Sequence, residues 1–368
     1  MANISAKDVQ ALREKTGAGM MDCKKALVEA EGDVDKAIEV LRERGLAAAT
    51  KKAGRIAAEG VVCSYFDEAA KIGVLVEVNS ETDFVAKNDK FQGLVKGVAE
   101  TVAKENPADV ETLKDTKFAG SDRTVAETFQ EAVLSIGENM NIRRFERVEG
   151  ICATYIHMGG AVGVLVNFNV DDDTAAKAEF KEMGKNVAMQ IAAMKPEYLS
   201  DSDISAEELE KMRNITVQSA LNTPDSLPKP ILTSIINKAI AAKRWADADV
   251  AAYEEQKNNK FLFNFLSKEA IAVLAEIAVA DQNEYAANPI FGKLVDGRIA
   301  KQLKETCLLK QEFVRGDLFE GNVEGYVASV AKALGANVKV KSFFRYERGE
   351  GLQKREDDFA AEVASMMK

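Results

Sequence analysis

The sequence predicts an α+β protein in which one strand-and-helix module occurs twice and the second copy carries a long helical insertion. The segment GVLVEVN at 73–79 returns as GVLVNFN at 163–169. Both are short apolar runs rich in β-branched residues, which is typical of buried strands. RFERVEG at 144–150 similarly returns as RYERGEG at 345–351. Because internal duplications usually fold as similar units, we expect two α/β modules whose sheets are shared or abut.

The spacing of the repeated segments locates the insertion. Gly73 and Arg144 are 71 positions apart, whereas Gly163 and Arg345 are 182 apart, so copy two is 111 residues longer. We expect the additional stretch at 196–310, where almost every pattern is helical. We expect an enlarged, coiled-coil-like helical arm, and a segment of this size favours a bundle over a bare two-helix hairpin.

Composition restricts the classes of function. The chain has 46% hydrophobic and 29% charged residues, an ordinary soluble globular mixture. Its net charge of −10 argues against nucleic acid as a partner, which requires a basic face. No run is long enough to cross a membrane, and the N-terminus lacks an export signal. The cysteines form no C-x-x-C pair, so we expect reduced thiols, no metal, no cofactor and a cytoplasmic location.

The N-terminal region, 1–50, is predicted to form a three-helix unit. Ser5 followed by Asp8 is a variant capping box at the start of the first helix. Asp33 is expected to cap the third helix and Gly45 to end it.

The two core modules follow in order. Module one covers 51–150 and module two covers 151–195 and 311–351, separated by the arm. A final amphipathic helix is expected at 352–368. The elements expected in the modules are a hairpin of Val61–Phe66 and Lys71–Asn79, a helical period from Asp83, a helix at 124–136, and strands at Ile142–Val148, Ile151–Ile156 and Gly163–Asn169.

The arm has clear helix signals. Ser205–Glu208 is a capping box that opens a helix reaching about Leu221. Prolines then interrupt the pattern. Further helices are expected at 231–242, 246–256, 261–280 and 289–306.

The corner after the strand at 73–79 has two interpretations. Thr82 is a plausible N-cap, and Asp83 and Phe84 follow in the first helical turn. Phe84 is either a core anchor or a residue presented to a partner. The second copy has Asp173-Thr174 at the matching place in the sequence. Since a core anchor that the fold requires should occur in both copies, this difference favours the second interpretation.

Other candidate residues are equally open from pattern alone. Met20 and Met21 start a helix, where they fit either a core-filling or a pliable contact role. His157, the single histidine, ends a predicted strand and is more typical of a structural or surface residue than of a catalytic one. No phosphate-binding loop, dinucleotide fingerprint or catalytic carboxylate pair is present. A protein-binding module is therefore favoured over an enzyme.

The chain resembles the elongation factor Ts family of bacterial nucleotide exchange factors along nearly its whole length. LREKTGAGMMDCKKAL at 12–27 and GDVDKAIEVLRERG at 32–45 are similar to its ubiquitin-associated-like helical domain. EVNSETDFVAKNDKF at 77–91 and IGENMNIRR at 136–144 resemble its core signatures, and DFAAEVASM at 358–366 its C-terminal helix. The arm departs from the family's short antiparallel coiled coil by some tens of residues.

The resemblance implies a partner and a mechanism. The partner would be elongation factor Tu, in its GDP-bound and nucleotide-free forms. The wedge that disturbs the partner's Mg²⁺ and phosphate site would be Thr82, Asp83, Phe84 and Val85. The residues implied as partner contacts are Arg13, Met20, Met21, Ile136, Gly137, His157, Phe359 and Val363.

Two other hypotheses fit parts of the sequence. The first is a non-catalytic adaptor that binds a protein partner through the N-terminal helices, with the duplicated core as passive scaffold. Those helices resemble domains that bind ubiquitin-like proteins. The second is an enzyme that uses the arm as a lid.

Overall fold

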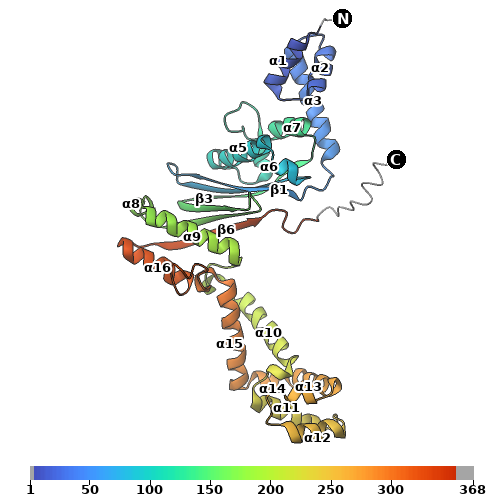
Figure 1. Cartoon of the computed structure of the whole chain (residues 1–368), viewed down its shortest axis with the longest axis vertical. Helices are drawn as coiled ribbons and strands as arrows, with labels where there is room; N and C mark the ends of the chain where they lie inside the picture. Colours follow the sequence, from blue (N-terminus) through green and yellow to red (C-terminus); the bar gives the residue numbers. More distant parts are fainter. Residues whose placement is uncertain (1–3, 354–368) are drawn as a thin grey trace, which may run out of the picture. The chain divides into compact units, whose positions relative to one another are not determined.

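The computed structural model describes residues 4–353, and Figure 1 draws their helices and strands. The α+β prediction is confirmed, since helices accompany two three-stranded antiparallel sheets. By internal contacts the chain divides into two compact units. The core unit runs to Lys195 and resumes at Phe313, and the arm is Pro196–Glu312.

Three helices open the core unit: α1 (Ala6–Thr16), α2 (Met20–Glu29) and α3 (Val34–Lys52). The predicted capping box is confirmed, because Ser5 Oγ accepts from the Asp8 amide and the Asp8 carboxylate accepts from the Ser5 amide. The helices share a small apolar core that includes Val9, Leu12, Cys23, Ala26, Leu27, Ala37 and Leu41.

The expectation that Gly45 ends the third helix is wrong. Helix α3 continues through Gly45 to Lys52 and packs against α7 (Val125–Ile136). A Cβ atom at Gly45 would lie 3.2 Å from the Gln130 carbonyl oxygen. The glycine therefore serves a close helix–helix approach, for which a missing side chain is useful inside a helix.

Each copy contributes one antiparallel sheet whose strand order follows the sequence. The strands are β1 (Glu59–Asp67), β2 (Ile72–Ser80) and β3 (Met140–Glu149) in copy one, and β4 (Ile151–His157), β5 (Val162–Asn169) and β6 (Lys339–Glu347) in copy two. Both sheets shift register at the same place, between Glu77 and Val78 in one and between Asn167 and Phe168 in the other.

Helices cover the outer face of each sheet. Helix α5 packs on β1 and β2, and α9 packs on β4 and β5 (Figure 1). The helical period expected from Asp83 is interrupted, because Lys87-Asn88 separates α4 from α5 and Asn88 caps α5. The remaining helices of the copies are α4 (Asp83–Ala86), α5 (Asp89–Glu105), α6 (Val110–Asp115), α8 (Asp172–Ala175), α9 (Ala178–Met194) and α16 (Val323–Leu334).

The two sheets abut through their inner faces rather than merging into one. A shared cluster is formed by Val62, Leu75, Cys152, Leu165 and Tyr346. Gly73 and Gly163 make this approach possible, because a Cβ atom at Gly73 would lie 2.7 Å from Leu165 and one at Gly163 2.4 Å from Val62. The glycine at the second position of β2 and of β5 is thus required by the close packing of the two sheets.

Strand pairing corrects one of the sequence matches. Gly73 lies opposite Val148, and Gly163 lies opposite Tyr346, so Val148 corresponds to Tyr346. The match of RFERVEG with RYERGEG pairs Val148 with Gly349 instead, which is three residues out of register. Similar residues recur along β3 and β6, but the backbone pairing of β3 with β2 and of β6 with β5 defines which positions are equivalent.

The helix after that strand corrects a second match. Thr82 caps α4 by accepting from the amide three residues on, and Asp171 caps α8 in the same way. Phe84 therefore corresponds to Asp173 and not to Thr174. The aromatic is absent from copy two, as expected, but its counterpart is an exposed acid.

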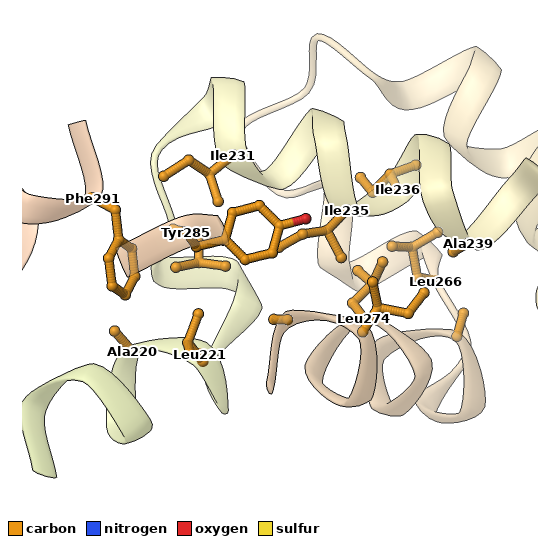
Figure 2. Close-up of a cluster of buried hydrophobic side chains, with 14 of the residues drawn as sticks. Ala220, Leu221, Ile231, Ile235, Ile236, Ala239, Leu266, Leu274, Tyr285 and Phe291 are labelled. Atoms are coloured by element: carbon orange, nitrogen blue, oxygen red, sulfur yellow. The ribbon is translucent and has the colours of Figure 1, made fainter. Parts of the chain in front are cut away.

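The arm is a helical bundle with its own apolar core. Helices α10 and α15 pack together, and α11 packs on α13. Figure 2 shows Ile231 and Ile235 from α11 gathered in that core with Leu274 from α13 and Tyr285 from α14. The predicted capping box at Ser205 is confirmed. The arm's helices are α10 (Ala206–Leu221), α11 (Lys229–Ala241), α12 (Asp247–Gln256), α13 (Lys268–Ala280), α14 (Gln282–Ala286) and α15 (Pro289–Thr306), with short 3-10 turns at Asp201–Asp203, Pro224–Ser226, Leu262–Phe265 and Leu308–Lys310.

Backbone pairing closes the base of the arm. Tyr198 and Cys307 form an isolated parallel bridge. The amides of Glu197 and Tyr198 both donate to the Thr306 carbonyl, at 2.9 and 3.2 Å. The two chain segments that enter and leave the bundle are therefore hydrogen-bonded to each other.

Candidate functional site

Phe84 projects from the corner between β2 and α4 with 81% of its surface exposed. Its core-anchor interpretation is wrong, because the next residue, Val85, is the one buried in the copy-one core. Thr82 is the N-cap of α4, as predicted, and its hydroxyl accepts from the Val85 amide at 3.4 Å. The corner therefore keeps one apolar side chain in the core and presents the other to solvent.

Two carboxylates join this corner to the turn after α7. Glu138 accepts from the Thr82 amide at 3.0 Å and from the Thr82 hydroxyl at 2.7 Å. In the opposite direction, Glu81 accepts from the Asn139 amide at 2.6 Å. Two candidate segments, Thr82–Val85 and Ile136-Gly137, are thus held together by residues that the sequence did not single out.

Asp83 is a charged residue at the same corner. Lys87 lies 2.6 Å from its carboxylate, and hydrogen bonding from that lysine lowers the pKa of Asp83. The positive charge of Arg348 acts in the same direction. Because the group is ionised at neutral pH, the corner presents an anion beside an exposed aromatic ring.

Gly137 ends α7 in the left-handed conformation, with φ of 91°. Its amide donates to the Val133 carbonyl at 2.9 Å, which closes the helix. Ile136, the last residue of the helix, is half-buried against the core of copy one. This turn places the Glu138 carboxylate next to Thr82.

His157 is exposed at the end of β4, where its Nδ1 lies 3.0 Å from the Tyr155 hydroxyl. The turn after it is tied to the first sheet, because the Val62 amide donates to the Gly160 carbonyl at 2.8 Å. His157 therefore lies in the core unit near the start of β1. Among the described residues its side chain contacts Tyr155 on the same strand, and it does not contact Phe84 or Glu138.

Met20 and Met21 are exposed by 53% and 62% at the start of α2. Their core-filling interpretation is wrong, since Cys23 and Leu27 occupy the buried face of that helix instead. Arg13 is exposed on α1. Phe359 and Val363 lie outside the described residues.

The described part of the chain contains no group of three or more His, Cys, Asp or Glu residues arranged to hold a metal ion. Within the same residues, no helix is both long and apolar enough to cross a membrane. The cysteines are free thiols, and burial raises the pKa of Cys152 to about 12.

Comparison with known proteins decides the family. The family model described as Elongation factor TS matches residues 81–350, from the corner before Phe84 to the end of the second sheet. The chain belongs to the elongation factor Ts family. It is 40% identical to elongation factor Ts of Clostridium perfringens (strain SM101) over 366 residues, and 41% identical to that of Syntrophotalea carbinolica over 372, covering 99% of both chains in each case. With elongation factor Ts of Clostridioides difficile (strain 630) it shares 40% identity over the full length of both chains.

These matches confirm the resemblance drawn from the sequence motifs and show that the protein is a translation elongation factor by family. Since each alignment covers 99% or more of both chains, these three relatives are similar to this chain in overall length.

Proposed function

We propose that the chain is a cytoplasmic guanine nucleotide exchange factor for elongation factor Tu. It binds the GDP-bound GTPase, disturbs the Mg²⁺ and phosphate site, and releases GDP during translation elongation. The observation that supports this proposal is Phe84, an almost fully exposed aromatic at the first turn of a short, braced helix. Family membership indicates the class of partner.

The mechanism is differential binding. A ligand shifts an equilibrium only by binding one state more tightly than the other. Phe84 gains apolar contacts only if it enters a space that opens in the partner as the metal site is disturbed. Burial there favours the nucleotide-free state, and by reciprocity GDP or GTP weakens the complex when it rebinds.

The remaining candidate contact residues would bind elongation factor Tu in both its GDP-bound and its nucleotide-free state. Met20 and Met21 offer exposed, flexible apolar side chains, which suit a docking surface. Arg13, Gly137 and His157 are exposed as well, and Ile136 borders the same turn as Gly137. We assign these residues to docking and the corner at Thr82–Val85 to release.

The direct test is stopped-flow release of a fluorescent GDP analogue from elongation factor Tu, with and without this chain. The proposal requires release to accelerate and to saturate with the concentration of the chain. Binding without acceleration would overturn it and leave the adaptor hypothesis. No binding to the GTPase in either nucleotide state would also overturn it, and would leave the adaptor hypothesis with a different protein partner.

A further inference from the structure

The polar atoms of Thr82 are all engaged by neighbours. Its amide and hydroxyl both donate to the Glu138 carboxylate, and its carbonyl accepts from the Ser80 hydroxyl at 2.9 Å. The Thr82 hydroxyl oxygen also accepts from the Val85 amide. Phe84 lies between two residues, Thr82 and Val85, whose backbones are fixed in this way. Hydrogen bonds to a carboxylate are about twice as strong as those between neutral groups.

A second contact runs in the reverse direction between the same two segments. Glu81 Oε1 accepts from the Asn139 amide, and its side chain is only 12% exposed. Arg55 approaches the same oxygen at 3.5 Å, and its carbonyl accepts from the Asn139 side chain at 2.8 Å. The corner and the turn after α7 are therefore crosslinked twice, by Glu138 and by Glu81.

Copy two folds the same elements without this crosslink. Helix α16 ends at Gly335 in the left-handed conformation, as α7 ends at Gly137. The residue after each glycine is Ala336 in copy two and Glu138 in copy one. Helix α8 nevertheless forms, with Asp171 as its cap. The crosslink is thus not a requirement of the fold, and it occurs in the copy that carries the exposed aromatic.

We propose that Glu138 is a positioning residue for nucleotide exchange: its carboxylate fixes Thr82 so that Phe84 is presented in one orientation. This inference rests on the proposed exchange function. A helix of four residues has no stability of its own, since helix nucleation is unfavourable. Without Glu138, the first turn of α4 would become ordered only when Phe84 enters the partner. The entropy lost in that ordering would slow the release step and would not weaken docking.

The kinetic test measures GDP release against the concentration of the chain. Glu138→Ala should lower the maximal release rate by about tenfold, from two lost charge-assisted bonds. The half-saturation value should change by less than about twofold. Glu138→Gln retains an acceptor for the Thr82 amide and a donor for its hydroxyl, so its rate should stay within about threefold of the parent.

Two comparisons separate positioning from general stability. Asp171→Ala removes the cap of the corresponding helix in copy two and should leave the maximal rate unchanged. In a Phe84→Ala background, Glu138→Ala should add little further loss, because Glu138 acts through Phe84. Additive rate losses would overturn the inference.

Amide hydrogen exchange of the free chain tests the crosslink without the partner. Glu138→Ala should speed exchange at the Thr82 amide by about tenfold or more, while Asp171→Ala should not. Unchanged protection at Thr82 would overturn the crosslink itself. Faster exchange with an unchanged release rate, in a protein where Phe84→Ala does lower that rate, would overturn the positioning role alone. If Phe84→Ala leaves the rate intact, the proposed wedge fails and the inference falls with it.

Discussion

The two copies of the module have nearly the same skeleton and differ at a few side chains. Helices α5 and α9 each have 17 residues, α7 and α16 each have 12, and both sheets carry a register shift at the same place. Only copy one has the aromatic corner and its Glu138 crosslink, and only copy two carries the arm. Features present in both copies serve the fold, whereas those present in one are available for function.

A buried charge also distinguishes the copies. Glu77 on β2 is fully buried and accepts from Arg143, Arg144 and the Gly349 amide at 3.0, 2.7 and 2.8 Å. Burial alone would raise the pKa of Glu77, but these hydrogen bonds outweigh it and lower the pKa below its usual value. The corresponding Asn167 on β5 donates only to the Glu149 carbonyl.

The largest effect is expected in the arm, the insertion that sets copy two apart. Leu274 is fully buried in the arm's core, so Leu274→Ala should destabilise the arm by about 3 to 5 kcal/mol. Trp245 is the single tryptophan, and its indole donates to the Ala270 carbonyl in the same cluster. The fluorescence of Trp245 should therefore show that the arm of the variant reaches its unfolding midpoint at a lower urea concentration than the parent arm. If the urea midpoint of the core, followed by circular dichroism, decreased by the same amount, arm and core would unfold together.

The next effect concerns the buried charge of copy one. Glu77→Ala removes the buried carboxylate that two arginines share and should cost the core about 3 kcal/mol. This is the lower end for a broken buried pair, because both arginines reach solvent and Arg144 keeps its ion pair with Glu350. Asn167→Ala should cost about 1 kcal/mol. Urea unfolding followed by circular dichroism measures both. Equal losses in the free energy of unfolding would show that Glu77 and Asn167 contribute equally to stability.

The corner should affect exchange and leave stability unchanged. Phe84→Ala should lower the maximal GDP release rate by about ten- to a hundredfold, since a partly inserted phenylalanine contributes less than a core one. The melting temperature should not change, because the side chain is exposed. Asp173→Ala, at the matching position of copy two, is the control and should alter neither. A change in half-saturation alone would make Phe84 an ordinary docking residue.

The smallest effect is a pH dependence at the end of β6. Hydrogen bonds from Arg345 and then from Lys195 lower the pKa of Glu347 to about 2. The unfolded value is near 4.3, so the stabilisation is present above that pH and is lost as pH falls toward 2. Glu347→Gln should lower the melting temperature at pH 7, and the difference should shrink at pH 3. The effect is modest, because the side chain is 40% exposed and screened by solvent.

Glu149 provides the control for this last prediction. It is the counterpart of Glu347, has one arginine partner, Arg147, and is 75% exposed. Glu149→Gln should therefore change the melting temperature less at pH 7. A constant difference for Glu347→Gln between pH 7 and pH 3 would contradict the proposed ion pairing.

Local signals predicted the elements well, and non-local contacts account for what was missed. Capping residues at Ser5 and Ser205 marked helix starts, and proline at 289 marked the start of α15. The role of Gly45 depends on Gln130, a residue distant in the sequence, so no local pattern reveals it. Glu138 contacts Thr82 across 56 positions, and only the structure brings that turn to the corner.

The backbone pairing at the base of the arm has a consequence for how chains of this family can differ in length. Because Tyr198 is hydrogen-bonded to Thr306 and Leu308, the residues on either side of Cys307, the chain enters and leaves the arm at adjacent points. Whole helices between Tyr198 and Cys307 can be gained or lost through in-frame insertion or deletion while the path of the chain through both sheets stays the same. Length polymorphism among homologous genes is therefore expected to fall between these two codons, leaving the spacing from Gly73 to Glu138 constant.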